Sequence, residues 1–356
     1  MANNSTTAIE IVTKSDTFVA AAVFVSNEAS YYIEVTLDLV LVTILAFVGI
    51  GTNIIDIVVF GRQGFRDSVN ISLSAIATMD LIKCVTGAAA RMNGILGLFS
   101  TALAVTWKNI CTPTLLYLQI FVGYVSYVMA AYVAVERCLC VSMPFKVKSL
   151  ITPKLTFCMM VMITVVVMGS FSVVFFIYRI DWVYSDKYGQ TIAIYGYSDF
   201  YDRHNFGVMW YYNLIGVINP ILSFTVMVVC TVIIFYHLRK ASKFRQQSQQ
   251  GGQESGKGGS GDQGMSSRDR QVIKMLLVVI IIYIINFVPR ISMYVAKLFV
   301  KEYYFLKRYH NIFMLSTYTL FVIDFLNASM NLFIYLTMSS NFRATFFSLF
   351  IARKKV

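Results

Sequence analysis

Seven long apolar runs, separated by shorter polar segments, dominate the pattern of this chain. A bilayer core about 30 Å thick needs about 20 apolar residues per helix, and every run is long enough to cross it. Strands of alternating apolar and polar residues are not found, so a membrane-spanning barrel is not expected. The pattern predicts an all-α membrane protein, a seven-transmembrane helix bundle over 34–337. Its runs lie near 35–60, 70–96, 110–136, 155–178, 207–236, 272–298 and 310–337.

Composition narrows the class of protein further. Of 356 residues, 57% are hydrophobic and 13% are charged, whereas soluble domains carry about 25% charged residues. The mean hydropathy of +0.66 also favours a lipid environment. The chain has only three histidines and no nucleophile–base or metal constellation that we recognise. We therefore expect neither an enzyme nor a resident organic cofactor.

The distribution of Lys and Arg predicts the orientation in the membrane. With an extracellular N-terminus, the segments near 61–69, 137–154, 237–274 and 338–356 face the cytoplasm, and they hold 18 of the 30 basic residues. This bias follows the positive-inside rule. The net charge of +12 is thus explained by topology, and no nucleic-acid partner is needed.

The segments outside the runs have distinct characters. Residues 1–33 are expected to form an extracellular tail, in which Asn3 and Asn4 each begin a glycosylation sequon. Residues 241–270 are rich in Gly, Gln and Ser and predict a flexible cytoplasmic loop. Residues 338–356 predict an amphipathic eighth helix and a basic tail at the lipid surface. The apolar face of that helix gathers Phe342, Phe346, Leu349 and Phe350.

Two local signals add detail. Thr152 followed by Pro153 fits an N-cap and a first-turn proline, and so predicts the start of the fourth helix. The longest outer loop, 179–206, is rich in Tyr and Asp and is expected to form a hairpin over the bundle.

Polar side chains inside the apolar runs need an explanation, because an ionisable group costs about 2.5–3.5 kcal/mol at mid-bilayer. Asp80 lies within the second run, and polar groups on other runs lie at similar depth. Together they predict a cluster of oxygen ligands for a small cation. The alternative, which the pattern alone favours, is hydrogen bonding between helices without an ion. The other members of the cluster are Asn53, Ser126, Asn327 and Asn331.

A second polar set lies in the outer halves of the helices and comprises Lys83, Arg91, Arg290 and Asp324. If these side chains line a hydrated cavity, they form a pocket of net positive character. Such a pocket suits an anionic ligand or a peptide with a carboxylate. The alternative is mutual pairing, such as Asp324 with Lys83 or with Arg290. Both alternatives stay open, and ligand binding can rearrange the pairs.

Short motifs on successive runs together resemble those of the rhodopsin-like (class A) G-protein-coupled receptors, over nearly the whole chain. Glu136-Arg137-Cys138 resembles the triplet that ends helix three in that family. The segment "ERCLCVSMPFKVKSLIT" is similar to invertebrate chemosensory and neuropeptide receptors, molluscan ones especially. The other matches are Gly51-Thr52-Asn53, Asn70, Leu73, Ala77, Asp80, Leu81, Pro144, Pro220, Pro289, Asn327, Asn331, Tyr335 and Phe342-Arg343.

The resemblance implies a plasma-membrane receptor that binds an extracellular ligand, a peptide or a small molecule, and activates a heterotrimeric G protein. In the inactive state Arg137 would pair with Glu136 and with Asp269, and an agonist would swing helix six outward. Pro144 and Tyr335 would belong to the same cytoplasmic switch. The resemblance also implies a sodium ion as an allosteric modulator, held by Asp80, Ser126, Asn327 and Asn331.

Several positions depart from the family pattern. Phe287 replaces the tryptophan of helix six, and Leu332 replaces the proline of helix seven. Residues 159–229 contain no cysteine, so Cys111 cannot form the usual bridge to the outer loop, and we expect no disulfide. Gln119 stands where amine receptors carry an aspartate, and it joins Phe287 in the expected ligand pocket.

Two other classes stay open. One is a divergent receptor-like protein that no longer signals, given the missing landmarks of helices six and seven. The other is a transporter or channel, for which inverted repeats or paired broken helices are typical. Neither of those two features is evident in the sequence.

Overall fold

The computed structural model describes residues 24–143, 147, 150–250, 267–300, 302–304 and 307–350. The predicted sequon residues Asn3 and Asn4 lie outside the described residues, as does Pro144. Seven of its helical spans are long and apolar enough to cross a membrane. The predicted seven-helix bundle is confirmed.

Several of the seven spans are built from consecutive helical segments of different type. In chain order the segments are α2 (Asn27–Ile33), the π-helical η1 (Glu34–Val42), α3 (Thr43–Gln63), α4 (Ser68–Ala90), α5 (Met92–Leu96), α6 (Thr101–Cys111), the π-helical η2 (Thr112–Leu116), α7 (Tyr117–Ser142), α9 (Pro153–Phe171), the 3-10 helical η3 (Ser172–Phe176), α10 (Asp199–Gln250), α11 (Ser267–Phe299), α12 (His310–Met338) and α13 (Ser340–Phe350). Between η3 and α10 lie two strands, β1 (Tyr178–Ser185) and β2 (Gln190–Tyr197).

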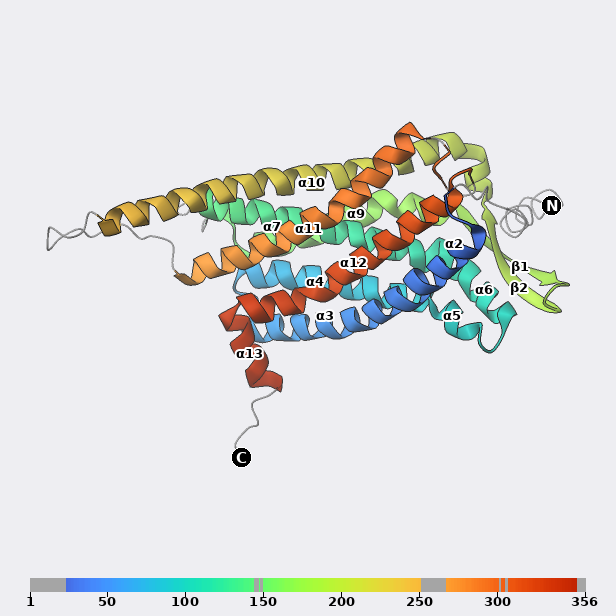
Figure 1. Ribbon diagram of the computed structural model, residues 1–356, viewed down its shortest axis with the longest axis horizontal. Helices are drawn as coiled ribbons and strands as arrows, with labels where there is room; N and C mark the ends of the chain where they lie inside the picture. The colour runs from blue at the N-terminus through green and yellow to red at the C-terminus, as the bar shows by residue number, and fades with distance from the viewer. Residues whose placement is uncertain are drawn as a thin grey trace, which may run out of the picture.

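Figure 1 shows the bundle lengthwise, with the two strands at one end and α13 turning away at the other. We call these the hairpin end and the α13 end. Gln63, the last residue of α3, donates a side-chain hydrogen bond to Thr345 of α13 at 3.3 Å, which ties the end of the first span to α13.

Local sequence explains several helix ends. Thr152 Oγ1 accepts a hydrogen bond from the Leu155 amide at 3.2 Å, and Pro153 begins α9, so the predicted helix start is confirmed. Asp67 caps α4 in the same way through the Val69 amide at 3.0 Å. In contrast, α12 runs without a break across Leu332, the position at which a proline was missing.

The predicted hairpin in 179–206 is confirmed. Strands β1 and β2 pair antiparallel, with Ser185 opposite Gln190, and Gly189 in the turn has a φ of +64°. Asn109 of α6 donates to the carbonyl oxygen of Ala193 at 2.8 Å and so fixes the hairpin over the bundle. Burial raises the pKa of the Tyr195 phenol.

The largest apolar core lies where α4, α7, α10, α11 and α12 meet, around fully buried rings such as Phe121, Tyr283 and Phe287. The outward faces are apolar too. Val165 and Val166 of α9 are 65% and 61% exposed, which suits contact with lipid rather than with water.

The eighth helix is present as α13. Phe342 is 1% exposed and packs edge-on against Phe60 of α3, with ring centroids 5.2 Å apart. Leu349 and Phe350 on the predicted apolar face are exposed. An exposed apolar face beyond the bundle is typical of a helix that lies on a membrane surface.

Two predicted boundaries are wrong. Residues 241–250 belong to α10 and 267–270 to α11, so the predicted loop 241–270 is helical at both ends. The Gln, Lys and Arg of "ASKFRQQSQQ" are good helix formers, and they let the fifth helix continue past its apolar run. The first span also begins earlier than predicted. Its first segment, α2, starts at Asn27, within the predicted tail 1–33, and Ser26 caps it by accepting a hydrogen bond from the Ala29 amide.

Candidate functional site

Glu136 and Arg137 lie near the end of α7, at the α13 end of the bundle, and are 1% and 7% exposed. Arg137 Nη2 lies 3.6 Å from Glu136 Oε2. Ser72 of α4 donates to Glu136 Oε2 at 3.1 Å, and Thr156 of α9 donates to Oε1 at 2.8 Å. Buried charge needs such partners, so Glu136 holds three helices together as well as the arginine.

Arg137 is less completely held than Glu136. Its Nε has no hydrogen-bond partner within the described part of the chain. Asp269 lies near the start of α11, but its side chain is outside the described residues, so the pairing of Arg137 with Asp269 stays a prediction. Tyr335 is 1% exposed and packs against Phe60, with ring centroids 5.3 Å apart.

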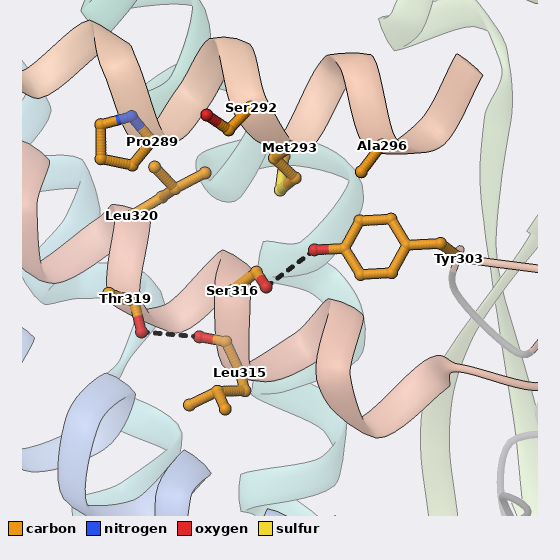
Figure 2. Close-up of a pocket in the computed structure, with 9 residues that line it drawn as sticks. All are labelled: Pro289, Ser292, Met293, Ala296, Tyr303, Leu315, Ser316, Thr319 and Leu320. Carbon is orange, nitrogen blue, oxygen red and sulfur yellow. Dashed lines mark hydrogen bonds between the residues drawn. The ribbon is translucent and has the colours of Figure 1, made fainter. Parts of the chain in front are cut away.

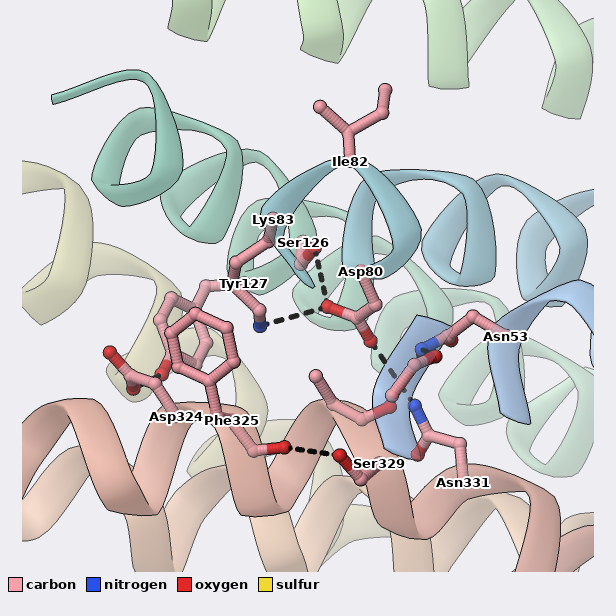
Figure 3. Close-up of polar contacts among 12 residues, drawn as sticks. Asn53, Asp80, Ile82, Lys83, Ser126, Tyr127, Asp324, Phe325, Ser329 and Asn331 are labelled. Atoms are coloured by element: carbon pink, nitrogen blue, oxygen red, sulfur yellow. Dashed lines mark hydrogen bonds and ion pairs between the residues drawn. The ribbon is translucent and has the colours of Figure 1, made fainter. Parts of the chain in front are cut away.

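Asp80 lies in the middle of the bundle and is fully buried (Figure 3). Ser126 of α7 donates to its Oδ1 at 3.1 Å, and Asn331 of α12 donates to its Oδ2 at 3.2 Å. The third partner is Lys83, whose ammonium lies 3.0 Å from Oδ1. The structure therefore brings together three predicted cation ligands, Asp80, Ser126 and Asn331, with a lysine that the sequence had assigned to the ligand pocket. Asn327 is also buried, but its Nδ2 has no hydrogen-bond partner among the described residues.

Arg290 and Asp324 pair closely between α11 and α12. Tyr127 of α7 donates to Asp324 Oδ1 at 2.5 Å. The guanidinium of Arg290 also lies over the rings of Tyr124 and Tyr127, 5.7 and 5.5 Å from their centroids. The pairing of Asp324 with Arg290, one of the two alternatives drawn from the sequence, is the one that this structure shows.

Phe287 lies next to this pair. It is 0% exposed, and its ring centroid is 4.3 Å from that of Tyr127. Tyr127 thus contacts both the ion pair and the ring that replaces the usual tryptophan.

The side chain of Arg91, at the end of the second span, contacts both the first and the third spans. Its Nη2 lies 2.5 Å from Asp38 Oδ1, and its Nη1 donates to Gln119 Oε1 at 3.0 Å. The guanidinium also lies 5.2 Å from the ring centroid of Phe321. Arg91 and Gln119, both predicted ligand contacts, are thus partners of each other.

The predicted net positive character of the outer set is not what the structure shows. Lys83 pairs with Asp80, Arg91 with Asp38 and Arg290 with Asp324. The prediction left Asp38 and Asp80 out of the set, and with them the three cations are balanced by three acids.

A cavity of about 500 Å³ opens between α11 and α12 in the hairpin-end half (Figure 2). Its walls are mostly apolar, with Tyr303 donating to Ser316 Oγ at 2.7 Å on one side. Pro289 and Leu320, which neighbour Arg290 and Asp324 on their helices, also line it. The volume is in the range of small-molecule sites, about 300–1,000 Å³. The six predicted ligand-binding residues do not line this cavity.

Asp56 was missed in the sequence, as Asp38 was. Asp56 of α3 is 0% exposed, and neither carboxyl oxygen has a hydrogen-bond partner in the described ranges. The cost of an ionisable group inside an apolar run, the rule that singled out Asp80, applies equally to Asp56 and would have found it. Nearby, Asn53 donates to the carbonyl oxygen of Ala328 at 2.9 Å and joins α3 to α12.

Comparison with known proteins places these features in a family. No individual curated protein matches the chain. Residues 40–353 match the family described as serpentine type 7TM GPCR chemoreceptor Srw, which covers all seven spans except the start of the first. The structure contains seven helices that can cross a membrane, as this family description requires, and the short helix α13 after them. The chain is therefore a multi-pass membrane protein that belongs to the serpentine-type, seven-transmembrane G-protein-coupled chemoreceptor family Srw.

Proposed function

We propose that this receptor binds an extracellular chemical cue in the hairpin-end half of the bundle and activates a heterotrimeric G protein at the α13 end. Family membership supports a receptor of this general type. The observation that carries the coupling step is the buried Glu136–Arg137 pair at the end of α7. In this proposal the hairpin end and the N-terminus face outward at the plasma membrane, as the distribution of Lys and Arg predicts.

The ligand we propose is small and carries a carboxylate or another anionic group. Arg290 is already bound to Asp324 and lies over two tyrosine rings, so an incoming anion would compete with Asp324 for the guanidinium. The neighbouring cavity of about 500 Å³ would accept the apolar part of such a ligand. A peptide could offer the same group through its C-terminus.

The coupling step follows from a two-state bundle. Ligand binding that separates Arg290 from Asp324 would loosen α11 from α12 and shift Phe287 through Tyr127. Outward movement of the α13 end of α11 would then expose Arg137 to the G protein. This sequence of events resembles that of rhodopsin-like receptors, and both that kinship and the likeness to molluscan receptors stay predictions.

Glu136→Gln is expected to raise the basal activity of the receptor. The substitution keeps the shape of the side chain but removes the charge that holds Arg137, at 3.6 Å, and weakens its bonds to Ser72 and Thr156. A loss of about 1 kcal/mol from the inactive state shifts a two-state equilibrium about fivefold. Nucleotide exchange on purified G proteins, measured with the receptor in lipid nanodiscs and without any ligand, gives the readout.

Arg137→Ala in the Glu136→Gln background is expected to return exchange to the level of empty nanodiscs. The matched control is Arg62→Ala in the same background, because Arg62 is an exposed arginine near the α13 end of α3. That control should keep the raised activity. If no G-protein class responds to Glu136→Gln, the chain is a receptor-like protein that does not signal. Ion flux through the variant would instead favour the channel alternative.

A further inference from the structure

The amine of Lys83 occupies the place beside Asp80 where a free cation would bind. Lys83 follows Asp80 by three residues on α4, so the two side chains share one face of the helix. The ammonium lies 3.0 Å from Asp80 Oδ1, and the residues are 4% and 0% exposed. Figure 3 shows the amine directed at the carboxylate from the side opposite Asn331.

Both oxygen atoms of the Asp80 carboxylate already have hydrogen-bond partners. Oδ1 accepts from Lys83 and from Ser126, and Oδ2 accepts from Asn331. Sodium prefers a shell of oxygen ligands, and two of the groups that point at Asp80 are nitrogen donors, which repel a cation. Lys83 already balances the charge of Asp80, so a sodium ion at this carboxylate would lie beside an ammonium that repels it. The residues present therefore do not fit the sodium site that the family resemblance implied.

We infer that the Lys83 ammonium is a tethered cation that takes the place of sodium at Asp80. A counter-ion fixed to the chain is always present, so the central polar cluster is held at any salt composition. The receptor is then insensitive to the sodium concentration outside the cell. This property concerns ion binding alone and does not depend on whether the receptor activates a G protein.

Removal of the tethered amine should restore a site for the free ion. In Lys83→Met the side chain keeps a similar length but has no charge, and Asp80 becomes a buried carboxylate without a counter-ion. Ser126 and Asn331 remain beside it, and both can offer an oxygen atom after a side-chain rotation. Sodium would then bind the folded state and raise the unfolding temperature.

The test compares thermal unfolding of the purified full-length chain in sodium chloride and in N-methylglucamine chloride at equal ionic strength. The wild type should unfold at the same temperature in both salts. Lys83→Met should unfold earlier in N-methylglucamine and gain about 3 °C or more in sodium. Adding Asp80→Asn should abolish that gain. The matched control is Lys297→Met. Lys297 lies in the last turn of α11, away from Asp80, and this variant should behave as the wild type in both salts.

A sodium-specific rise in the unfolding temperature of the wild type would overturn the inference, as would a folded Lys83→Met with no response to sodium. If Lys83→Met does not fold, sodium-23 NMR relaxation of the wild type decides the question. Saturable sodium binding that disappears in Asp80→Asn would contradict the tethered cation. A wild type without such binding supports it.

Discussion

Asp324→Ala is expected to destabilise the folded receptor by about 3–5 kcal/mol, because it leaves a buried guanidinium without its acid. The side chains of Arg290 and Asp324 are 9% and 14% exposed, so solvent screens the pair only weakly. The substitution also removes the acceptor of the Tyr127 hydrogen bond at 2.5 Å. The polar contact that joins α7, α11 and α12 through Asp324 is therefore lost.

The measurement is the unfolding temperature of the purified chain, together with its level at the cell surface. Replacing both partners, as in Arg290→Met with Asp324→Leu, should recover most of the lost stability, because no charge is then left unpaired. The matched control is Asp181→Ala in the hairpin. Arg179 lies 3.0 Å from Asp181 and 3.7 Å from Asp199, and the side chains of Arg179 and Asp181 are about one-third exposed. An exposed pair of this kind contributes about 0–1 kcal/mol.

Equal effects of Asp324→Ala and Asp181→Ala would contradict the central role of the Arg290–Asp324 pair. So would a double variant that is less stable than Asp324→Ala alone.

Gly49→Ala is expected to lower the unfolding free energy by about 1–3 kcal/mol through overpacking. A Cβ at Gly49 of α3 would lie 2.4 Å from Cys84 Sγ and 3.0 Å from Ser329 Oγ. Cys84 is fully buried, and Ser329 Oγ donates to the backbone carbonyls of Leu45 and Phe325 at 3.0 and 2.7 Å, so neither neighbour can move freely. The added methyl group would push α3 away from α4 and α12.

Gly51 provides the control for this substitution, two residues further along the same helix. A Cβ at Gly51 meets nothing within 4 Å, so Gly51→Ala should keep or slightly raise stability through its better helix propensity. Thermal unfolding of the two variants under one set of conditions compares them directly. If Gly51→Ala proves the more harmful of the two, the close contact of α3 with α4 is wrong.

The seven spans, the hairpin and the eighth helix could be predicted because each depends on local pattern. Apolar length fixes the spans, and Thr152-Pro153 fixes one boundary. The π-helical segments η1 and η2 could not be predicted, because one extra residue per turn leaves the apolar character of a run unchanged. The helical continuation of α10 past residue 240 was missed because apolar length was the criterion, whereas polar residues can extend a helix into water.

The polar sites were predictable as sets of residues but not as pairs. Asp80, Ser126 and Asn331 were expected to meet, and their side chains do. The partner of Lys83 depended on which way a long, flexible side chain turns, and Asp80 on its own helix is nearer than Asp324 on another. The pairing of Arg91 with Asp38 depended on the packing of the first span, which the sequence pattern does not encode.

No disulfide joins any of the six cysteines, all of which lie in the described part of the chain. The hairpin of β1 and β2 is held together by strand pairing, and a hydrogen bond from Asn109 to the carbonyl oxygen of Ala193 holds it over the bundle. A disulfide does not contribute. We therefore expect the chain to reach this fold without an oxidative step. Its unfolding temperature should accordingly be the same with and without a reductant, so that production in reducing cell-free systems should leave the hairpin in place over the bundle.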